Sequence, residues 1–218
     1  MQAILIPVKD LARAKQRLSA TLAQPGRTRL ARAMLEDVFA AVAGVGLGVR
    51  VFVVSSDPGA LAAARARGWE CLPESSQHSE SHSVDAASRI CAARGITALL
   101  RLPIDIPLAR ASDIAAVLAA CPASPGAVLV PSRSANGTNA LLRTPPGLFP
   151  SHFGPGSLNR HLEEAGRCRA YARLLRNPRI ELDVDDERDL QALAAREDVG
   201  EHTAAALSEL FPCPASRR

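Results

Sequence analysis

The sequence predicts a single α/β domain in which a mostly parallel mixed sheet is flanked by helices. Seven short apolar runs alternate with segments of helical periodicity along the chain, which is typical of parallel strands joined by crossover helices. The 218 residues are 47% hydrophobic, enough for one sizeable core. No abrupt change in composition marks a boundary between domains, so we expect one domain over residues 1–218, with a core of about 3–196 and a tail at 197–218.

The apolar runs are the predicted strands. Strands that are buried on both faces of a parallel sheet read as short continuous apolar runs rather than as alternating patterns. The seven runs are Ala3–Val8, Arg50–Ser55, Trp69–Leu72, Thr97–Leu102, Ala127–Pro131, Asn139–Leu142 and Arg179–Val184. We therefore expect seven strands in this order along the chain.

Helices are expected between the strands. Leu30, Met34, Val38 and Val42 recur at helical spacing and predict an amphipathic helix over Arg27–Ala43. The polar stretch from Pro73 to Ser83 has no periodicity and is expected to be a surface loop. Further helices are expected after Asp57 as N-cap with Pro58 in the first turn, over Val84–Arg94 with Ser83 as N-cap, over Leu158–Ala165 with Ser157 at its start, over Glu187–Ala195, and over Ala204–Leu210.

Composition excludes several classes of protein. No apolar run approaches the roughly 20 residues of a membrane span, and the N-terminus lacks a signal-peptide pattern, so we expect a cytoplasmic protein without membrane contact. The cysteines are odd in number and widely spaced, which disfavours a disulfide framework and a zinc site. They are Cys71, Cys91, Cys121, Cys168 and Cys213, and we expect them to be reduced.

The charge favours small phosphorylated ligands over nucleic acid. The net charge is +4 and the pI is about 9.1, but the arginines are dispersed along the chain. Only 3% of the residues are aromatic, so stacking platforms for single-stranded nucleic acid are scarce. We expect no nucleic-acid partner.

The first strand leads into a cationic stretch. Lys9, Arg13, Lys15 and Arg17 follow the apolar run in a loop that is expected to enter a helix. The chain has two lysines, and both lie here, which suggests a need for compact ammonium groups rather than planar guanidinium forks. A strand that runs into a helix start is a natural phosphate site, because the helix N-terminus adds free N–H donors. The alternative is that Arg13 and Arg17 merely solvate an outer helix face.

An acid follows the fourth predicted strand. Asp105 lies just past this apolar run, between Pro103 and Pro107, which stiffen its loop. Packing explains such an acid poorly, because an unpaired buried charge is costly. We interpret Asp105 as a metal ligand, with a simple turn role as the alternative.

A second acidic segment lies near the C-terminus. Asp183 and Asp185 are two residues apart in an extended segment, so their carboxylates point to the same side. Two close like charges repel unless a cation lies between them, and oxygen ligands of this kind suit Mg²⁺ bound jointly with phosphates. Asp185 or Asp186 alternatively caps the following helix, which explains one of the acids but not all of them.

Two glycine-containing segments lie between these acids. The segments are 136–140 and 153–157, and their glycines let the backbone approach a ligand closely. Thr138, Asn139 and Ser157 offer neutral hydrogen bonds there. Taken singly, each segment also reads as an ordinary turn.

Taken together and in order, these stretches resemble the guanylyltransferases of deazaflavin coenzyme F-420 biosynthesis. The resemblance covers about residues 3–190, in the motifs IPVKDLARAKQRL, LPIDIPL, GTNALL, FGPGS and LDVDD. It implies a single-domain, Rossmann-like nucleotidyltransferase of the glycosyltransferase-A type. The implied reaction transfers GMP from GTP to a small phosphorylated carboxylic acid and releases pyrophosphate.

The resemblance also implies roles for individual residues. Lys9, Arg13 and Lys15 are implied to be catalytic cations on the GTP phosphates, together with Asp105. Asp105, Asp183 and Asp185 are implied to hold Mg²⁺ or Mn²⁺. The implied acceptor site comprises Thr138, Asn139, Gly154, Gly156 and Ser157. The implied nucleotide site adds Pro7, Ser83 and Asp85; where relatives commonly show a G-L-N-like segment, this chain has SESHSVDAASR, with Asp85 about where an asparagine is usual.

The identity of both substrates stays open at the level of sequence. The acceptor is 2-phospho-L-lactate or phosphoenolpyruvate by resemblance, with 3-phospho-D-glycerate as a further alternative. A nucleotidyltransferase of the CTP or sugar-phosphate type is the nearest other reading, and a non-catalytic nucleotide-binding protein of the same fold is a more distant one. A homodimer is compatible with the sequence.

Overall fold

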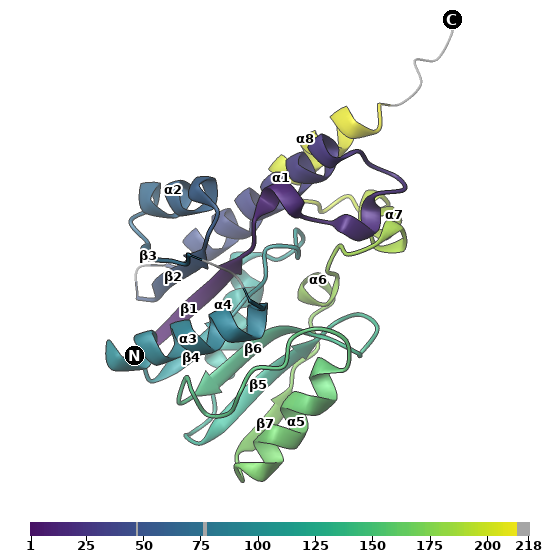
Figure 1. Ribbon diagram of the computed structural model, residues 1–218. Helices are drawn as coiled ribbons and strands as arrows, with labels where there is room; N and C mark the ends of the chain where they lie inside the picture. Colours follow the sequence, from purple (N-terminus) through teal and green to yellow (C-terminus); the bar gives the residue numbers. More distant parts are fainter. Residues whose placement is uncertain (47, 76–77, 213–218) are drawn as a thin grey trace, which may run out of the picture.

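A seven-stranded sheet forms the centre of the computed structural model, which describes residues 1–46, 48–75 and 78–212 (Figure 1). The strand order is β3-β2-β1-β4-β6-β5-β7. β1 pairs in parallel with β2 and β4, β3 with β2, and β7 with β5. β6 runs antiparallel to its neighbours β4 and β5. The expectation of a mostly parallel mixed sheet is therefore confirmed.

The strands and helices alternate along the chain for most of its length. The strands are β1 (Gln2–Val8), β2 (Arg50–Ser55), β3 (Glu70–Pro73), β4 (Ala98–Arg101), β5 (Gly126–Pro131), β6 (Thr138–Thr144) and β7 (Tyr171–Leu174). The helices are α1 (Gln24–Ala43), α2 (Pro58–Ala66), α3 (Glu80–Ala93), α4 (Ala111–Ala119), α5 (Ser157–Arg167), α6 (Pro178–Glu181), α7 (Glu187–Ala194) and α8 (Glu201–Leu210). Two short 3-10 turns, Leu11–Arg13 and Gln16–Leu18, follow β1.

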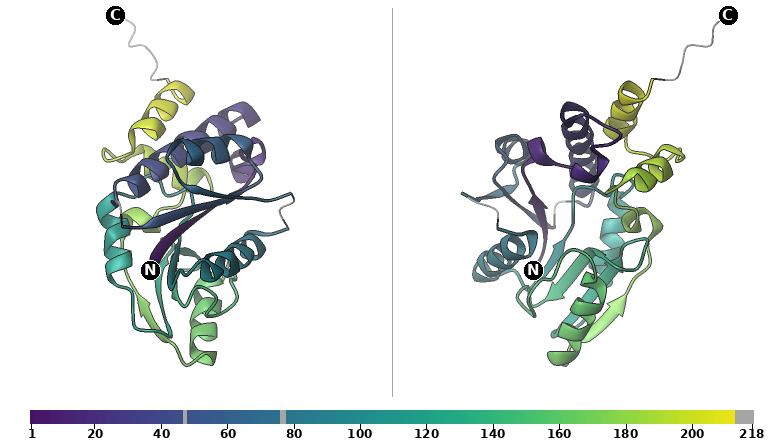
Figure 2. Two further views of the ribbon diagram at one scale, coloured as in Figure 1. Left: turned by 90° about the vertical axis from the view of Figure 1, so that its left-hand side faces the viewer. Right: turned by 45° about the vertical axis from the view of Figure 1, so that its right-hand side comes forward.

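Helices cover both faces of the sheet (Figures 1 and 2). Side chains alternate between the faces along β1: Ile4 and Ile6 pack in one core cluster with residues of α1, α2 and α4, and Leu5 packs in another with α3. A third cluster joins β5 and β6 to α5. This burial explains why the strands read as continuous apolar runs in the sequence.

One predicted strand is wrong. Residues 178–181 of the expected strand Arg179–Val184 form helix α6 instead, and the following residues are extended without strand pairing. Asn177 decides this, because its side chain accepts from the backbone N–H of Arg179 and Ile180 at 3.1 Å each, and Pro178 is suited to a first helical turn. The strand that actually closes this side of the sheet is β7, in which all four residues are exposed. Without a buried face, β7 carries no apolar signal.

Four helix starts differ from expectation, and one of them is that of α8, which begins three residues early at Glu201. α1 begins three residues early at Gln24, with Pro25 in its first turn. α3 begins at Glu80 with Ser79 as N-cap, so the expected loop ends earlier and Ser83 lies inside the helix. Gly156, with φ +75°, is the N-cap of α5, and Ser157 is the first helical residue. Asp57 caps α2 as predicted, accepting from the Ala60 N–H at 2.8 Å.

The cationic stretch after β1 is not a regular helix. It consists of the two 3-10 turns, and Lys15 between them has φ +54°, a left-handed conformation that L-residues rarely adopt. Continuous α-helix is incompatible with this backbone. The cations therefore project from a folded loop rather than from one helix face.

Four of the predicted free cysteines, Cys71, Cys91, Cys121 and Cys168, are free thiols. Cys213 and the end of the tail, 213–218, lie outside the described residues. Of the helices that the structure describes, none combines the length and apolar character needed to cross a bilayer.

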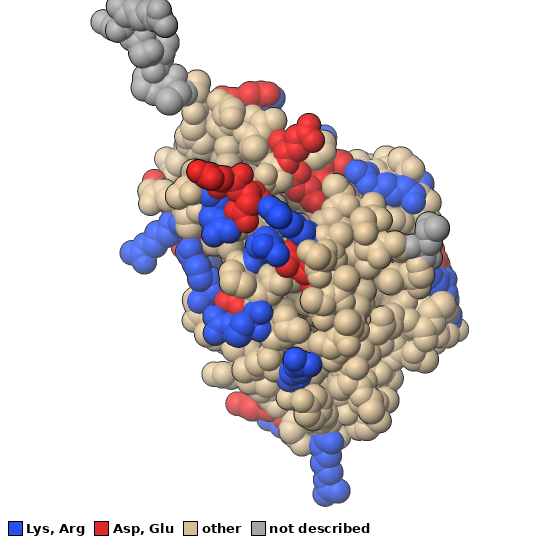
Figure 3. All heavy atoms as spheres, turned by 180° about the vertical axis from the view of Figure 1, so that it is seen from behind, with Lys and Arg blue, Asp and Glu red and all other residues tan. Residues whose placement is uncertain are grey.

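The back of the molecule carries interspersed charges. Figure 3 shows acidic and basic side chains next to one another on this face. Ion pairs between the C-terminal segments and the rest of the chain follow the same pattern: Arg179 Nε lies 2.7 Å from Asp113 Oδ2, and Arg133 lies 2.8 Å from Asp189. A polyanion would meet both signs of charge on this face.

Replacing Asp37 with Ala is expected to lower the free energy of unfolding by about 1–2 kcal/mol. Asp37 on α1 is buried and accepts from the backbone N–H groups of His202 and Thr203 at 3.0 and 2.8 Å, so it caps α8 from another helix. Urea unfolding measures the loss. Asp37→Asn keeps an acceptor and should lose less; equal stability of Asp37→Ala and the native protein would contradict this role.

Candidate functional site

Two adjoining pockets open at the edge of the sheet where β1 and β4 end. The larger, about 850 Å³, is lined by the β5–β6 connection, the starts of α3 and α5, and residues 183–189; we call it the large pocket. The smaller, about 680 Å³, is lined mainly by residues 7–17; we call it the cationic pocket. Both are lined by Lys9, Arg17, Glu80, Arg101, Pro103, Asp105 and Asp185. Ligands in the two pockets would therefore meet across these shared residues.

The cationic pocket contains the predicted basic stretch. Pro7, Lys9, Arg13 and Lys15 all line it. The Arg13 side chain is 87% exposed, whereas that of Lys15 is 9% exposed. Burial, followed by the nearby charge of Arg101, lowers the pKa of Lys9. The structure thus brings these four predicted residues together in the lining of one pocket.

Lys15 holds two of the predicted acids together. Its ammonium lies 2.7 Å from Asp105 Oδ2 and 3.1 Å from Asp185 Oδ1. Burial disfavours the charged lysine, but the charges of Asp105 and Asp185 outweigh it and raise the pKa of Lys15. Burial likewise opposes ionisation of Asp105, and the Lys15 charge and hydrogen bond outweigh it and lower the pKa of this carboxyl. Lys15 and Asp105 are therefore both charged at neutral pH.

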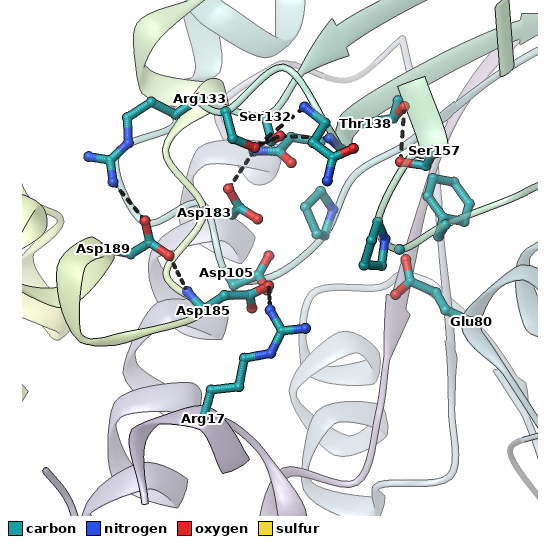
Figure 4. A pocket seen from close by; sticks show the side chains of 18 of the residues that line it. Arg17, Glu80, Asp105, Ser132, Arg133, Thr138, Ser157, Asp183, Asp185 and Asp189 are labelled. Atoms are coloured by element: carbon teal, nitrogen blue, oxygen red, sulfur yellow. Dashed lines mark hydrogen bonds and ion pairs between the residues drawn. The ribbon is translucent and has the colours of Figure 1, made fainter. Parts of the chain in front are cut away.

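The third acid lies beside this pair with a different environment (Figure 4). Burial, and then the charge of Asp105, raise the pKa of Asp183 from 3.8 to about 6, and the charge of Asp185 adds to this. Asn139 Nδ2 donates to Asp183 Oδ1 at 3.1 Å, which favours the ionised form but does not outweigh the other effects. The environment of Asp183 therefore disfavours its ionised form.

The donor set suits a hard divalent cation. Asp105, Asp183 and Asp185 offer carboxylate oxygens, which Mg²⁺ and Mn²⁺ prefer, and Asp183 forms no ion pair with a lysine or arginine of the described residues. Within the described part of the chain, no three His, Cys, Asp or Glu side chains are arranged closely enough to enclose a metal ion. In this structure the Lys15 ammonium donates hydrogen bonds to both Asp105 and Asp185. A metal bound to these acids would have to take over that neutralising position.

The far side of the large pocket carries hydroxyl groups. Thr138, at the start of β6, and Ser157, at the start of α5, both line it, and Ser157 Oγ donates to Thr138 Oγ1 at 3.4 Å (Figure 4). Gly154 lines the same pocket with φ +111°. Gly156 has φ +75°, and its N–H donates to Asn136 Oδ1 at 3.0 Å rather than into the pocket. The left-handed backbone at both positions favours glycine.

Asn139 lines the large pocket, but its amide is already engaged. The Nδ2 group donates to the carbonyl oxygens of Ile180 and Glu181 at 2.9 and 3.1 Å, and to Asp183. These bonds tie β6 to the acidic segment. In this structure Asn139 therefore positions Asp183.

Ser83 and Asp85, the other predicted nucleotide contacts, lie outside the described lining of both pockets. The Ser83 hydroxyl donates to the Ser79 carbonyl within α3 at 3.2 Å. Asp85 accepts from the Ser151 N–H at 3.1 Å and lies 3.5 Å from Arg143. Both side chains are engaged inside the protein.

Two residues of the site were not predicted. Arg101, the last residue of β4, is buried, lies 4.1 Å over the Phe153 ring and donates to the Asn139 carbonyl at 3.0 Å; burial lowers the pKa of its guanidinium to about 10. Glu80 pairs with Arg101 and lies 3.5 Å from Lys9. A signal for Arg101 existed in the sequence, because an arginine closes an otherwise apolar strand directly before the acidic loop.

Comparisons with known proteins show the family of this chain. The family model described as guanylyl transferase, CofC like, matches residues 2–208. A phosphoenolpyruvate guanylyltransferase of Rubrobacter xylanophilus is 41% identical over 195 residues, covering 88% of this chain and 92% of the relative. One of Chloroflexus aggregans is 35% identical over 201 residues, covering 90% and 98%.

The fold has counterparts among solved structures. A Desulfovibrio desulfuricans protein, whose crystal structure is described as that of a nucleotide-diphospho-sugar transferase, superposes with a TM-score of 0.74 over 96% of both chains at 16% identity. At this identity the likeness concerns the fold alone, and it confirms the nucleotidyltransferase fold expected from the sequence. Since the family model spans nearly the whole chain, the chain belongs to the CofC-like guanylyl transferase family.

Proposed function

We propose that this protein transfers GMP from GTP to phosphoenolpyruvate, with release of pyrophosphate, as a step of coenzyme F-420 biosynthesis. 2-Phospho-L-lactate and 3-phospho-D-glycerate are the alternative acceptors. The single observation that supports this most strongly is the shared boundary of the two pockets, where Lys9 and Arg101 lie with Asp105 and Asp185, the two acids that Lys15 contacts from the cationic pocket. Cations and metal-type carboxylates at one boundary suit a reaction between two anionic phosphates.

The proposed division of the site follows its chemistry. The GTP phosphates bind in the cationic pocket against Lys9, Arg13 and Lys15. The phosphorylated acid binds in the large pocket, where Thr138, Ser157 and the backbone at Gly154 offer neutral donors. The reacting groups then meet beside Asp105 and Asp185.

No side chain needs to act as a general base. The second pKa of a phosphate monoester is near ~6, so the acceptor phosphate is already largely a dianion at neutral pH. Its oxygen attacks the α-phosphorus of GTP in line with the departing pyrophosphate, forming one P–O bond as the α–β bridging bond breaks. The chain's task is to hold two mutually repelling anions in line and to neutralise them, which the cationic pocket supports.

Asp105, Asp183 and Asp185 would hold Mg²⁺ or Mn²⁺, since their oxygens fit such an ion and Asp183 forms no ion pair within the described part of the chain. When bound, the ion supplies charge neutralisation on phosphate oxygens. Lys15 is the residue that has to give up its contacts to these acids, and the GTP phosphates are the group its ammonium would then meet.

The direct test is incubation of the purified protein with MgCl₂, one of GTP, CTP, ATP or UTP, and each of the three acceptors, followed by mass analysis. We expect pyrophosphate and the guanylylated acid with GTP, and most product with phosphoenolpyruvate. Product formation with CTP alone would replace the guanylyl assignment, and nucleotide binding without pyrophosphate from any acceptor would exclude catalysis.

Replacing Glu80 with Gln is expected to tighten acceptor binding about fivefold, which corresponds to about 1 kcal/mol. In the free protein the Glu80 carboxylate forms ion pairs with Lys9 and Arg101, which line the large pocket as well as the cationic pocket. Glu80 therefore competes with an acceptor anion for these two cations. Calorimetric titration of phosphoenolpyruvate measures the change. Glu163→Gln, an exposed substitution on α5, is the matched control. Weaker binding by Glu80→Gln would mean that Glu80 orients the cations instead.

A further inference from the structure

A buried histidine stands behind the hydroxyl groups of the large pocket. His161, on the second turn of α5, has no exposed surface, and its Nδ1 lies 3.0 Å from Thr138 Oγ1. Its Nε2 lies 2.9 Å from the backbone nitrogen of His152. Phe153, whose ring lies 5.2 Å from that of His161, closes one side. Both ring nitrogens therefore have defined partners.

The His152 contact determines which ring nitrogen carries the proton. A backbone N–H can only donate, so His161 Nε2 must be the unprotonated, accepting nitrogen. Burial, and then the charge of Arg143, lower the pKa of His161 from 6.5 to about 3, so the imidazole is neutral at physiological pH. A neutral imidazole with Nε2 unprotonated carries its hydrogen on Nδ1. His161 thus donates to Thr138 Oγ1.

This fixes the direction of the Thr138 hydroxyl. Thr138 Oγ1 accepts from His161 Nδ1–H and from the Ser157 hydroxyl, which fills its two lone pairs. Its own hydrogen has no acceptor among the described residues and is left for the large pocket, which Thr138 lines. The hydroxyl is consequently presented as a donor, the form that an anionic oxygen requires.

We propose that His161 is a positioning residue of the acceptor site, which aims the Thr138 hydroxyl hydrogen at an anionic oxygen of the phosphorylated acid. The inference rests on the proposed function for the identity of that acid, but it concerns a hydrogen-bond chain that any phosphate or carboxylate in the large pocket would meet. A donor aimed in advance needs no reorientation when the ligand arrives, which is why the chain of bonds adds affinity.

Nuclear magnetic resonance of the protein labelled with ¹⁵N-histidine tests the first step without turnover. We expect a protonated-type Nδ1 and an unprotonated-type Nε2 for His161, the less common tautomer, with no titration between pH 5.5 and 8. His152, whose Nε2 lies 3.3 Å from Glu164 Oε1, provides the internal comparison with a protonated Nε2. A proton on His161 Nε2 would overturn the proposal.

Two substitutions separate positioning from space filling. The side-chain amide of Asn can overlay the imidazole Nδ1 and keep the donor to Thr138, whereas Gln overlays Nε2 and keeps only the partner of the His152 N–H. We expect His161→Gln to weaken phosphoenolpyruvate binding about tenfold, the loss of one hydrogen bond to a charged group, and His161→Asn to stay within about threefold of native. The KM for GTP should move in neither variant. Equal weakening by both variants would show that His161 only fills the core.

The Thr138→Val variant completes a double-mutant cycle between His161 and Thr138. If His161 acts through the Thr138 hydroxyl, adding His161→Gln to Thr138→Val should weaken acceptor binding no further, whereas independent roles would give additive losses. Binding is measured by calorimetry with phosphoenolpyruvate and with inorganic phosphate. Thermal melts of each variant check the fold. If the variants differ in binding but the native protein shows no turnover, the proposed function is contradicted and the positioning role stands. If the native protein shows turnover but the variants bind alike, the positioning role is contradicted and the proposed function stands.

Discussion

Replacing Asp183 with Asn is expected to lower kcat/KM by about 10²–10³-fold while stabilising the folded protein. The carboxylate is proposed to hold the metal ion, and an amide is a much weaker ligand. At the same time Asn removes a charge that burial and Asp105 make unfavourable, as the raised pKa of Asp183 shows. Activity and stability should thus move in opposite directions.

The sign of the stability change follows from the pKa. The Asp183 carboxyl has a pKa of about 6 in the folded state against an ordinary 3.8, so the folded protein holds this proton more tightly. The contribution of Asp183 to the free energy of unfolding is therefore present at low pH, where the carboxyl is protonated, and is lost as the pH rises through about 6. Above that pH, Asp183→Asn should raise the free energy of unfolding by about 1–3 kcal/mol, and at pH 4 it should change it little.

The measurement is a pair of thermal melts at pH 4 and pH 7.5 in EDTA, together with initial rates in MgCl₂. Asp198→Asn, which alters an exposed ion pair with Arg196 outside both pockets, is the control and should affect neither quantity by much. Turnover of Asp183→Asn within tenfold of the native rate would remove Asp183 from the proposed metal site.

Replacing Lys15 with Met is expected to cost both stability and turnover. The substitution leaves Asp105 and Asp185 facing one another without the ammonium that bridges them at 2.7 and 3.1 Å. Breaking a buried pair in this way costs about 2–4 kcal/mol at neutral pH. Loss of a cation on the transferring phosphates should lower kcat/KM by about 10²–10³-fold.

The pH and metal dependence of Lys15→Met distinguish the causes of the loss. The stabilisation from Asp105, whose pKa is lowered by Lys15, is present above 3.8 and disappears as the pH falls through its folded-state value, so the variant and the native protein should converge in acid. Mg²⁺ should raise the melting temperature of Lys15→Met more than that of the native protein, because the cation then replaces the missing ammonium. A smaller Mg²⁺ shift in the variant would contradict the proposed exchange of cations.

Lys15→Arg is the matched control for charge. It keeps the positive charge but replaces a compact ammonium by a planar guanidinium on a backbone with positive φ. We expect stability close to native and turnover clearly reduced. Full activity of Lys15→Arg would show that charge alone is sufficient at this position.

Much of the fold could be predicted because buried strands and helix faces leave recognisable hydrophobic patterns in the sequence. β1, β2 and β5 are buried along almost their whole length, and each was visible as an apolar run. β7 shows the limit: its residues are exposed, and its place at the sheet edge comes from backbone pairing with β5, which leaves no trace in hydrophobicity. The expected strand at Arg179–Val184 failed because a local cap by Asn177 outcompeted an apolar pattern.

The residues of the candidate site likewise fall into those that the sequence could reveal and those that it could not. Lys9, Lys15, Asp105 and Asp185 could be selected from local patterns in the sequence. The two lysines of the chain follow the first apolar run, Asp105 follows another apolar run where packing explains a charge poorly, and Asp185 lies two residues from a second acid. Arg101 left a local signal as a charge that closes an apolar strand, but Glu80 left none, because it joins the site by pairing with Arg101 across 21 positions of the chain, at the boundary of the two pockets. Ser83 and Asp85 illustrate the opposite case, since resemblance selected them and the fold gives them internal partners.

The amino-acid sequence by itself determined most of the buried strands, the charged segments that follow the first and fourth strands, and the family to which the chain belongs, because these depend on local periodicity and on motifs in a set order. Only the tertiary structure decided that a lysine ammonium sits between two aspartates and that a buried histidine directs the Thr138 hydroxyl. The physical reason is that partners of a charge or a hydrogen bond are chosen by distance in space, and residues 90 or 170 positions apart meet only after the sheet has formed.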